Sequence, residues 1–110
     1  MIDTSLLRSL FEDEALVKKY LAVFRQDVPL SMSDMKSSIL NQDWEHTSII
    51  AHSLKSQLQY LNETQASETA LSVEKMCETG LEPDLEILTS EIKTLENSLQ
   101  NIFKNLDEVL

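Results

Sequence analysis

Apolar residues recur at alternating spacings of three and four over the C-terminal part of the chain. They are Leu85, Leu88, Ile92, Leu95, Leu99, Ile102, Leu106 and Val109. The seam therefore has a period of about 3.5 residues, typical of helices that pack side by side at a crossing angle of about 20°. The pattern predicts one long helix. Pro83 suits its first position, where the missing N–H needs no intrahelical partner.

Two helices are predicted in the first 40 residues. A short one covers residues 4–11, with Asp3 or Thr4 as its cap and an apolar side formed by Leu6, Leu7, Leu10 and Phe11. A second begins near Asp13, and its apolar residues are Leu16, Tyr20, Phe24 and Val28, then Met32, Met35 and Ile39. Because Pro29 cannot donate a backbone hydrogen bond, we expect one helix bent at Val28–Pro29 or two helices nearly end to end.

Two further helices fill the middle of the chain. The third is predicted over residues 44–61, with Asp43 as its N-cap and a core side of Thr47, Ile50, Ala51, Leu54, Leu58 and Leu61. The fourth is predicted over residues 63–79 and turns Ala66, Ala70, Val73 and Cys77 inward. Gly80, the only glycine, stands where a helix often ends in a left-handed residue.

These elements predict an all-α fold, an antiparallel up-down four-helix bundle with an additional short N-terminal helix, in a single domain over residues 1–110. One glycine and two prolines are too few for the turns of an all-β fold. A separate coiled coil of the C-terminal seam is the alternative, but it would leave the other amphipathic helices uncovered. An intramolecular bundle covers every apolar side with short loops.

Composition narrows the classes of function. A net charge of -10 disfavours nucleic-acid binding, and no apolar run reaches the roughly 18 residues of a membrane span. The N-terminus does not resemble a secretion signal, and the single cysteine, Cys77, cannot form an internal disulfide. One glycine cannot build a phosphate-binding loop, and His46 and His52 point about 120° apart on their helix, which disfavours a metal site. We therefore expect a cytoplasmic monomer with no metal and no cofactor bound by this chain.

One polar group on the third helix is centred on His52. At about 100° per residue, the core side of this helix lies almost opposite His52. Within about 60° of His52 lie Glu45, Ser48, Lys55, Ser56 and Gln59, with Ile49 on the flank. The pattern predicts that His52 points into water. A solitary exposed histidine can also be incidental, as we expect for His46.

The neighbours of His52 suit phosphoryl chemistry. A neutral imidazole is a good nucleophile, and Lys55, one turn along, can offset the charge of a phosphoryl group. Ser56 is small and lies on the same face, so the active-site loops of a partner can approach. Lys55 could equally form an ordinary surface pair, which contributes little.

The segment Ala51-His52-Ser53-Leu54-Lys55-Ser56 resembles the signature of the histidine-containing phosphotransfer (HPt) domain: alanine, histidine, any residue, leucine, lysine, glycine. Further matches span nearly the whole chain: Leu10-Phe11, Phe24, Pro29, Asp43-Trp44 and Val73-Glu74. The six-residue motif is the specific part. Ser56 departs from the usual glycine, and Asn62 replaces a second glycine near the helix end, where asparagine also tolerates a left-handed conformation.

The resemblance implies roles for three residues. His52 matches the histidine that accepts the phosphoryl group, and Lys55 matches the lysine that supports it. Glu74 matches a polar residue of the facing helix that in some members hydrogen-bonds the imidazole. We expect Ile49, Ser56 and Gln59 to form part of the face that docks a partner.

The function implied is that of a phosphorelay intermediate without kinase activity of its own. It would accept a phosphoryl group on His52 from a receiver-domain aspartate, in a response regulator or hybrid sensor kinase, and pass it to another receiver. The Mg²⁺ would be bound by the receiver. The alternatives are a helical adaptor that binds receivers without phosphotransfer, which the serine at position 56 favours, and a dimerisation bundle that uses the C-terminal seam.

Overall fold

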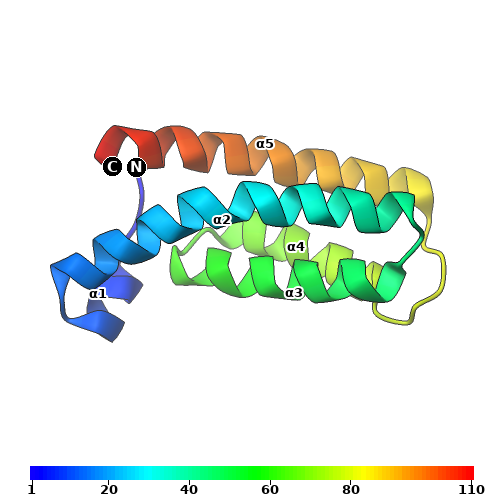
Figure 1. Cartoon of the computed structure of the whole chain (residues 1–110), viewed down its shortest axis with the longest axis horizontal. Coiled ribbons are helices and arrows are strands. Elements are labelled where there is room, and N and C mark those ends of the chain that lie inside the picture. Colours follow the sequence, from blue (N-terminus) through cyan, green and yellow to red (C-terminus); the bar gives the residue numbers. More distant parts are fainter.

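The computed structural model describes residues 1–110, and its regular elements are all helices. In chain order they are α1 (Ser5–Phe11), α2 (Glu14–Leu40), α3 (Trp44–Tyr60), α4 (Thr64–Cys77) and α5 (Leu85–Val109). The four long helices run alternately in opposite directions, and α1 lies at one end of them (Figure 1). The predicted antiparallel bundle with an extra N-terminal helix is confirmed. None of the helices is long and apolar enough to cross a membrane.

Aspartate side chains cap the starts of α2, α3 and α5, and the cap of α2 is Asp13. Asp43 accepts a hydrogen bond from the backbone N–H of His46 at 3.1 Å, which confirms it as the cap of α3. Asp84 accepts from the N–H groups of Glu86 and Ile87, at 3.0 and 3.2 Å. The prediction that the last helix starts at Pro83 is therefore wrong. An aspartate one residue later satisfies two free donors, so it becomes the cap and the helix begins at Leu85.

The second helix passes through Pro29 without a break, so of the two predicted possibilities the single helix is correct. Figure 1 shows that α2 bends along its length. The proline ring removes one backbone hydrogen bond and crowds the preceding turn, which is the usual cause of such a bend.

Left-handed residues follow four of the helices, one in each connection to the next helix. Gly80 has φ 76°, as its position predicts, and Asn62 has φ 55°, which confirms that asparagine can replace glycine here. The turn between α3 and α4 is consequently only three residues long. It holds the two helices that carry the polar group around His52 close together.

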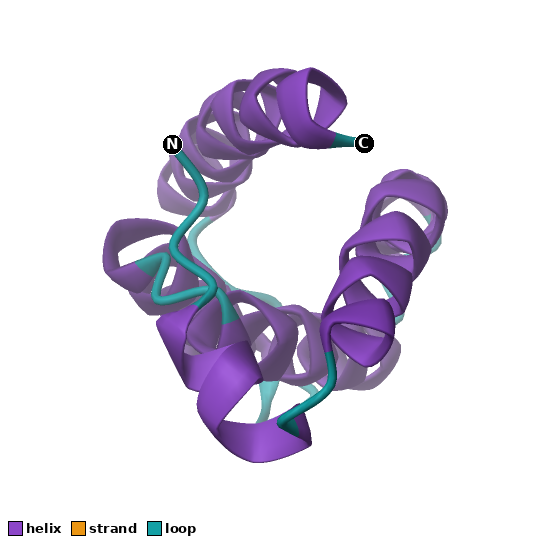
Figure 2. Ribbon diagram, turned by 90° about the vertical axis from the view of Figure 1, so that its left-hand side faces the viewer, coloured by secondary structure: helices purple, strands orange, loops and turns teal.

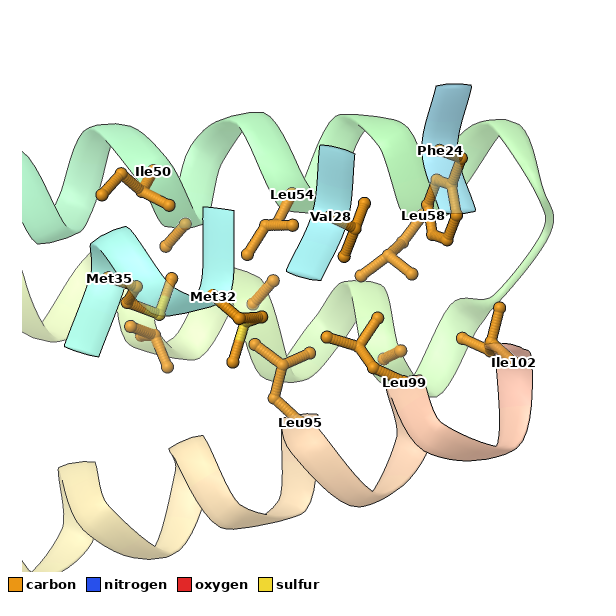
Figure 3. Close-up of a cluster of buried hydrophobic side chains, with 14 of the residues drawn as sticks. Phe24, Val28, Met32, Met35, Ile50, Leu54, Leu58, Leu95, Leu99 and Ile102 are labelled. Atoms are coloured by element: carbon orange, nitrogen blue, oxygen red, sulfur yellow. The ribbon is translucent and has the colours of Figure 1, made fainter. Parts of the chain in front are cut away.

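The core lies between the four long helices. Side chains from α2, α3 and α5 point toward one another in Figure 3, and the most buried include Phe24, Val28, Met35, Leu54, Leu58, Leu95 and Leu99. The predicted inner residues of α4, among them Cys77, are buried too. One polar pair lies within this interior. The hydroxyl oxygens of Ser38 and Thr47 are 2.7 Å apart, and each hydroxyl also lies within hydrogen-bond distance of a backbone carbonyl.

Some predicted apolar sides were placed a few tens of degrees away from the true core. On α2 the inner residues are Val17 and Leu21 rather than Leu16, which is 45 % exposed. Residues spaced by four advance about 400°, so a stripe read at this spacing drifts around the helix by about 40° at each step. In α1 only Leu7 is buried, whereas Leu10 and Phe11 are exposed, because this short helix touches the bundle along one narrow side.

The view of Figure 2, nearly along the bundle, shows the helices around a common centre. Consecutive helices pack as neighbours, and α3 against α4 is the most extensive contact. The bundle closes where α5 meets α2, and this is the least extensive contact between neighbouring long helices. The seam between α3 and α4 and the seam between α2 and α5 therefore lie on opposite sides of the bundle.

Candidate functional site

His52 lies near the middle of α3 and points into water. Its side chain is 59 % exposed, whereas its neighbours Ala51 and Leu54 are fully buried. The helical wheel is thus correct for this residue. The buried side chains on the opposite side of α3 fix the rotation of the helix about its axis. An imidazole in this place is open to a large partner.

A carboxylate from the next helix holds one nitrogen of His52. Glu74 Oε2 lies 2.9 Å from His52 Nδ1, and the Glu74 side chain is only 17 % exposed. The close approach of α3 and α4 makes this contact possible, since small residues line their interface: Ala51, Ala66, Ser67 and Ala70. The structure therefore brings together two residues that lie 22 positions apart in the sequence.

Lys55 completes a cluster of three charged or polar side chains. Its Nζ lies 3.4 Å from His52 Nδ1 and 3.4 Å from Glu74 Oε1, and its side chain is 18 % exposed. Glu74 Oε1 is buried and accepts no hydrogen bond, so Lys55 serves it as a charge partner. Before any phosphoryl group arrives, the lysine thus lies on the carboxylate side of the imidazole.

These distances favour one tautomer of His52. Nδ1 can donate a proton to Glu74 or accept one from Lys55, but it cannot do both. The carboxylate is nearer, at 2.9 Å against 3.4 Å, so the Nδ1–H form is favoured. The lone pair then sits on Nε2, the nitrogen that no protein group occupies.

Glu74 remains ionised at neutral pH although it is mostly buried. Burial alone would raise the pKa of its carboxyl group. The hydrogen bond with His52 and the positive charge of Lys55 outweigh that effect and lower the pKa below its ordinary value. A charged carboxylate at this position can stabilise positive charge that develops on the imidazole.

The three residues expected at a docking face lie along α3 around His52, but they are not equally exposed. Ile49 is 61 % exposed, Gln59 is exposed, and the half-buried Ser56 donates a hydrogen bond to the carbonyl of His52 at 3.3 Å. Ser48, expected on this open face, is instead 9 % exposed. It lies at the edge of the close contact between α3 and α4, which a wheel of one helix does not show.

Several apolar residues beside this face were not predicted to be exposed. Leu16, Val23 and Leu30 of α2 are 45, 44 and 67 % exposed, and they lie on the side of α2 next to α3. That side is located by two contacts: Tyr20 donates to the carbonyl of Gln57, and Asp34 pairs with His46. The signal in the sequence that could have identified this surface is the spacing of Leu16, which does not fit a core stripe with a period of about 3.5 residues along this helix.

Aromatic contacts join α1 to the same surface. Phe11 packs on Tyr20 at 6.3 Å between ring centroids, and Tyr20 packs edge-on to Tyr60 at 6.1 Å. Tyr20 is half-buried, which raises the pKa of its hydroxyl to about 12. The residue is therefore a neutral hydrogen-bond donor, and it fixes the end of α2 against α3.

Groups of three or more histidine, cysteine, aspartate or glutamate side chains able to hold a metal ion are not found in the structure. Cys77 is fully buried, and burial raises the pKa of its thiol, as expected of a packing residue rather than a nucleophile.

The site is thus an outward histidine whose inner nitrogen contacts a mostly buried carboxylate on a helical bundle. The model of the Hpt domain family matches residues 19–105, which contain all three residues of the cluster. The chain belongs to the Hpt domain family, whose members act in histidine phosphotransfer of two-component signalling and interact with receiver domains. Comparisons with curated proteins and with solved structures found no match.

Proposed function

We propose that this chain is a phosphorelay intermediate that takes a phosphoryl group from the aspartate of one receiver domain and gives it to another. His52 Nε2 is the acceptor atom. The observation that carries this proposal is the placement of the imidazole, 59 % exposed, with Nδ1 on Glu74 and Nε2 free. An adaptor that only binds receivers would have no use for an oriented nitrogen.

The proposed step is an in-line displacement. The Nε2 lone pair forms a bond to phosphorus as the bond from phosphorus to the aspartyl oxygen breaks, and the aspartate leaves as a carboxylate. The proton on Nδ1 stays in place, and Glu74 stabilises the positive charge that spreads over the ring. The receiver supplies the Mg²⁺. The reverse of this step passes the group to the next receiver, and no step needs ATP.

Lys55 has a proposed role in both states of the carrier. In the free domain it balances the buried charge of Glu74. Once Nε2 is phosphorylated, its flexible stem allows the ammonium group to move toward the phosphoryl oxygens, about one helical turn away. This exchange of partners keeps a positive charge between two negative groups.

The docking face is proposed to combine Ile49, Ser56 and Gln59 with the apolar side of α2. Leu16, Val23 and Leu30 provide exposed apolar area beside α3, and exposed apolar patches of this kind mark protein interfaces. The small Ser56 leaves room for the loops of a receiver near His52. We further propose that the domain works as a monomer in the cytoplasm.

The test is transfer from a receiver domain charged with acetyl phosphate. The native chain should gain phosphate that is labile in acid and stable in base, and the His52→Gln variant should gain none. His46→Gln is the matched control, because His46 is exposed on the same helix and also pairs with a carboxylate. Receiver binding without any label on the native chain would instead establish the adaptor, and label retained in His52→Gln would exclude His52 as the acceptor.

A further inference from the structure

A groove runs along the seam between α2 and α5, on the side of the bundle opposite His52. It consists of two hollows of about 620 and 350 Å³, which share Lys36, Glu96 and Gln100. The groove follows α5 from Leu88 to Phe103, and fifteen residues of helix span about 22 Å. It exists because α2 and α5 contact each other less than the other neighbouring helices do.

The floor of the groove is apolar over both hollows. The apolar residues among the ten that line the first hollow are Ile39, Leu40, Leu88 and Ile92, and those among the eight of the second are Pro29, Met32, Leu99 and Phe103. The other lining residues are polar or charged. Leu40 is 84 % exposed, more than any other leucine of the chain. An exposed leucine at the rim of an apolar groove is unfavourable in water, so a partner that covers it gains apolar burial.

The charges of the groove differ from those of the rest of the surface. The chain carries 19 acidic and 9 basic residues, yet the charged residues that line the two hollows are Lys36, Lys93 and Glu96. Lys36 pairs with Glu96 across the seam at 2.8 Å, whereas Lys93 is exposed and makes no ion pair. Two lysines and one glutamate give this lining a net charge of +1 on an acidic protein, and the unpaired Lys93 complements an acidic group of a partner.

We propose that this groove binds an amphipathic helix that carries acidic residues beside its apolar face. Apolar grooves between helices take up such helices through side chains one turn apart, and a length of about 22 Å fits about four turns. The acidic flank pairs with Lys93, and the apolar face covers Leu40, Leu88 and Ile92. Because the seam lies opposite the α3–α4 site, the helix and a receiver bind at the same time.

The probe is a pair of synthetic peptides of about 15 residues, with leucines at helical spacing and either glutamates or lysines on the flanks. Titrated into isotopically labelled protein, the glutamate peptide should shift amide signals of Leu88, Ile92 and Lys93 and leave those around His52 unchanged. The lysine peptide should bind at least about tenfold more weakly.

Variants at exposed positions distinguish peptide binding in the groove from non-specific binding, and they do not change the buried core. Leu40→Asp and Lys93→Glu should each weaken the glutamate peptide about tenfold, whereas the controls Leu10→Asp and Lys104→Glu should not. Equal binding of the two peptides, shifts on α3 and α4, or indifference to Leu40→Asp and Lys93→Glu would overturn the proposal. The proposal would also be overturned if sedimentation showed a dimer of the native chain that these two variants dissociate, since a second copy of the chain would then fill the groove. Phosphorylation of His52 is measured separately, so either proposal can fail alone.

Discussion

Two histidines lie on the exposed side of α3, and each is next to a carboxylate of a neighbouring helix, but their surroundings differ. His46 Nε2 lies 3.2 Å from Asp34 of α2, and His52 Nδ1 lies 2.9 Å from Glu74 of α4. Asp34 is 57 % exposed, whereas Glu74 is 17 % exposed. The His46 pair is therefore a solvated contact, and the His52 pair is a partly buried one that water screens less.

The two histidines also differ in which ring nitrogen contacts the carboxylate. At His46 the outer nitrogen, Nε2, is the one engaged, so an electrophile would have to displace the contact. At His52 the inner nitrogen is engaged and the outer one is open to a partner. The two histidines therefore differ in which ring nitrogen is left free for a partner.

The sharpest test of this difference is removal of the buried carboxylate. Glu74→Ala should reduce the rate of His52 phosphorylation roughly 10- to 100-fold, since a hydrogen bond to a charged group contributes about 1.5–3 kcal/mol. Nitrogen NMR should show the proton of the His52 ring on Nδ1 in the native chain and chiefly on Nε2 in the variant. Glu68→Gln, on the same helix and exposed, is the control. An unchanged ring tautomer in Glu74→Ala would show that Glu74 does not orient His52.

Removal of the lysine should have a smaller effect. Lys55→Ala should slow phosphorylation about three- to tenfold and shorten the lifetime of the phosphohistidine, because one of the two charges near the site is lost. The control is Lys104→Ala, an exposed lysine of α5. If both variants retain the native rate and lifetime, Lys55 only balances Glu74 and takes no part in transfer.

The lowered pKa of Glu74 predicts a dependence of stability on pH. Because folding lowers this pKa, the ionised carboxylate stabilises the fold above the unfolded-state value of about 4.3, and this contribution is lost as the pH falls through the folded-state value. The stability gap between the native chain and Glu74→Gln should be complete above about pH 5 and should narrow toward about pH 3. Urea unfolding at several pH values measures it, and a gap that widens in acid would contradict the sign of the shift.

The smallest expected effect belongs to the other histidine. His46→Gln should change the free energy of unfolding by less than about 0.5 kcal/mol and leave phosphotransfer intact, since exposed pairs contribute little. Urea denaturation and the receiver assay check both. A loss of transfer in this variant would mean that the contrast between the two histidines is wrong.

Much of this protein could be predicted from its sequence because helices leave a periodic record of their buried side. The bundle, the start of the second helix near Asp13, the cap at Asp43, the left-handed Asn62 and Gly80, and the outward direction of His52 are all local consequences of residue type and spacing. The resemblance of the motif around His52 named the family that the chain belongs to.

Only the tertiary structure decided which side chains of different helices are in contact. A wheel gives angles within one helix, but the contact of Glu74 with Nδ1, the burial of Ser48 and the exposure of Leu16 depend on the rotation and axial offset of two helices together. The α2–α5 groove likewise arises from how far two helices stand apart. Spacing along the chain does not encode these distances, because they result from the packing of all the side chains in the core.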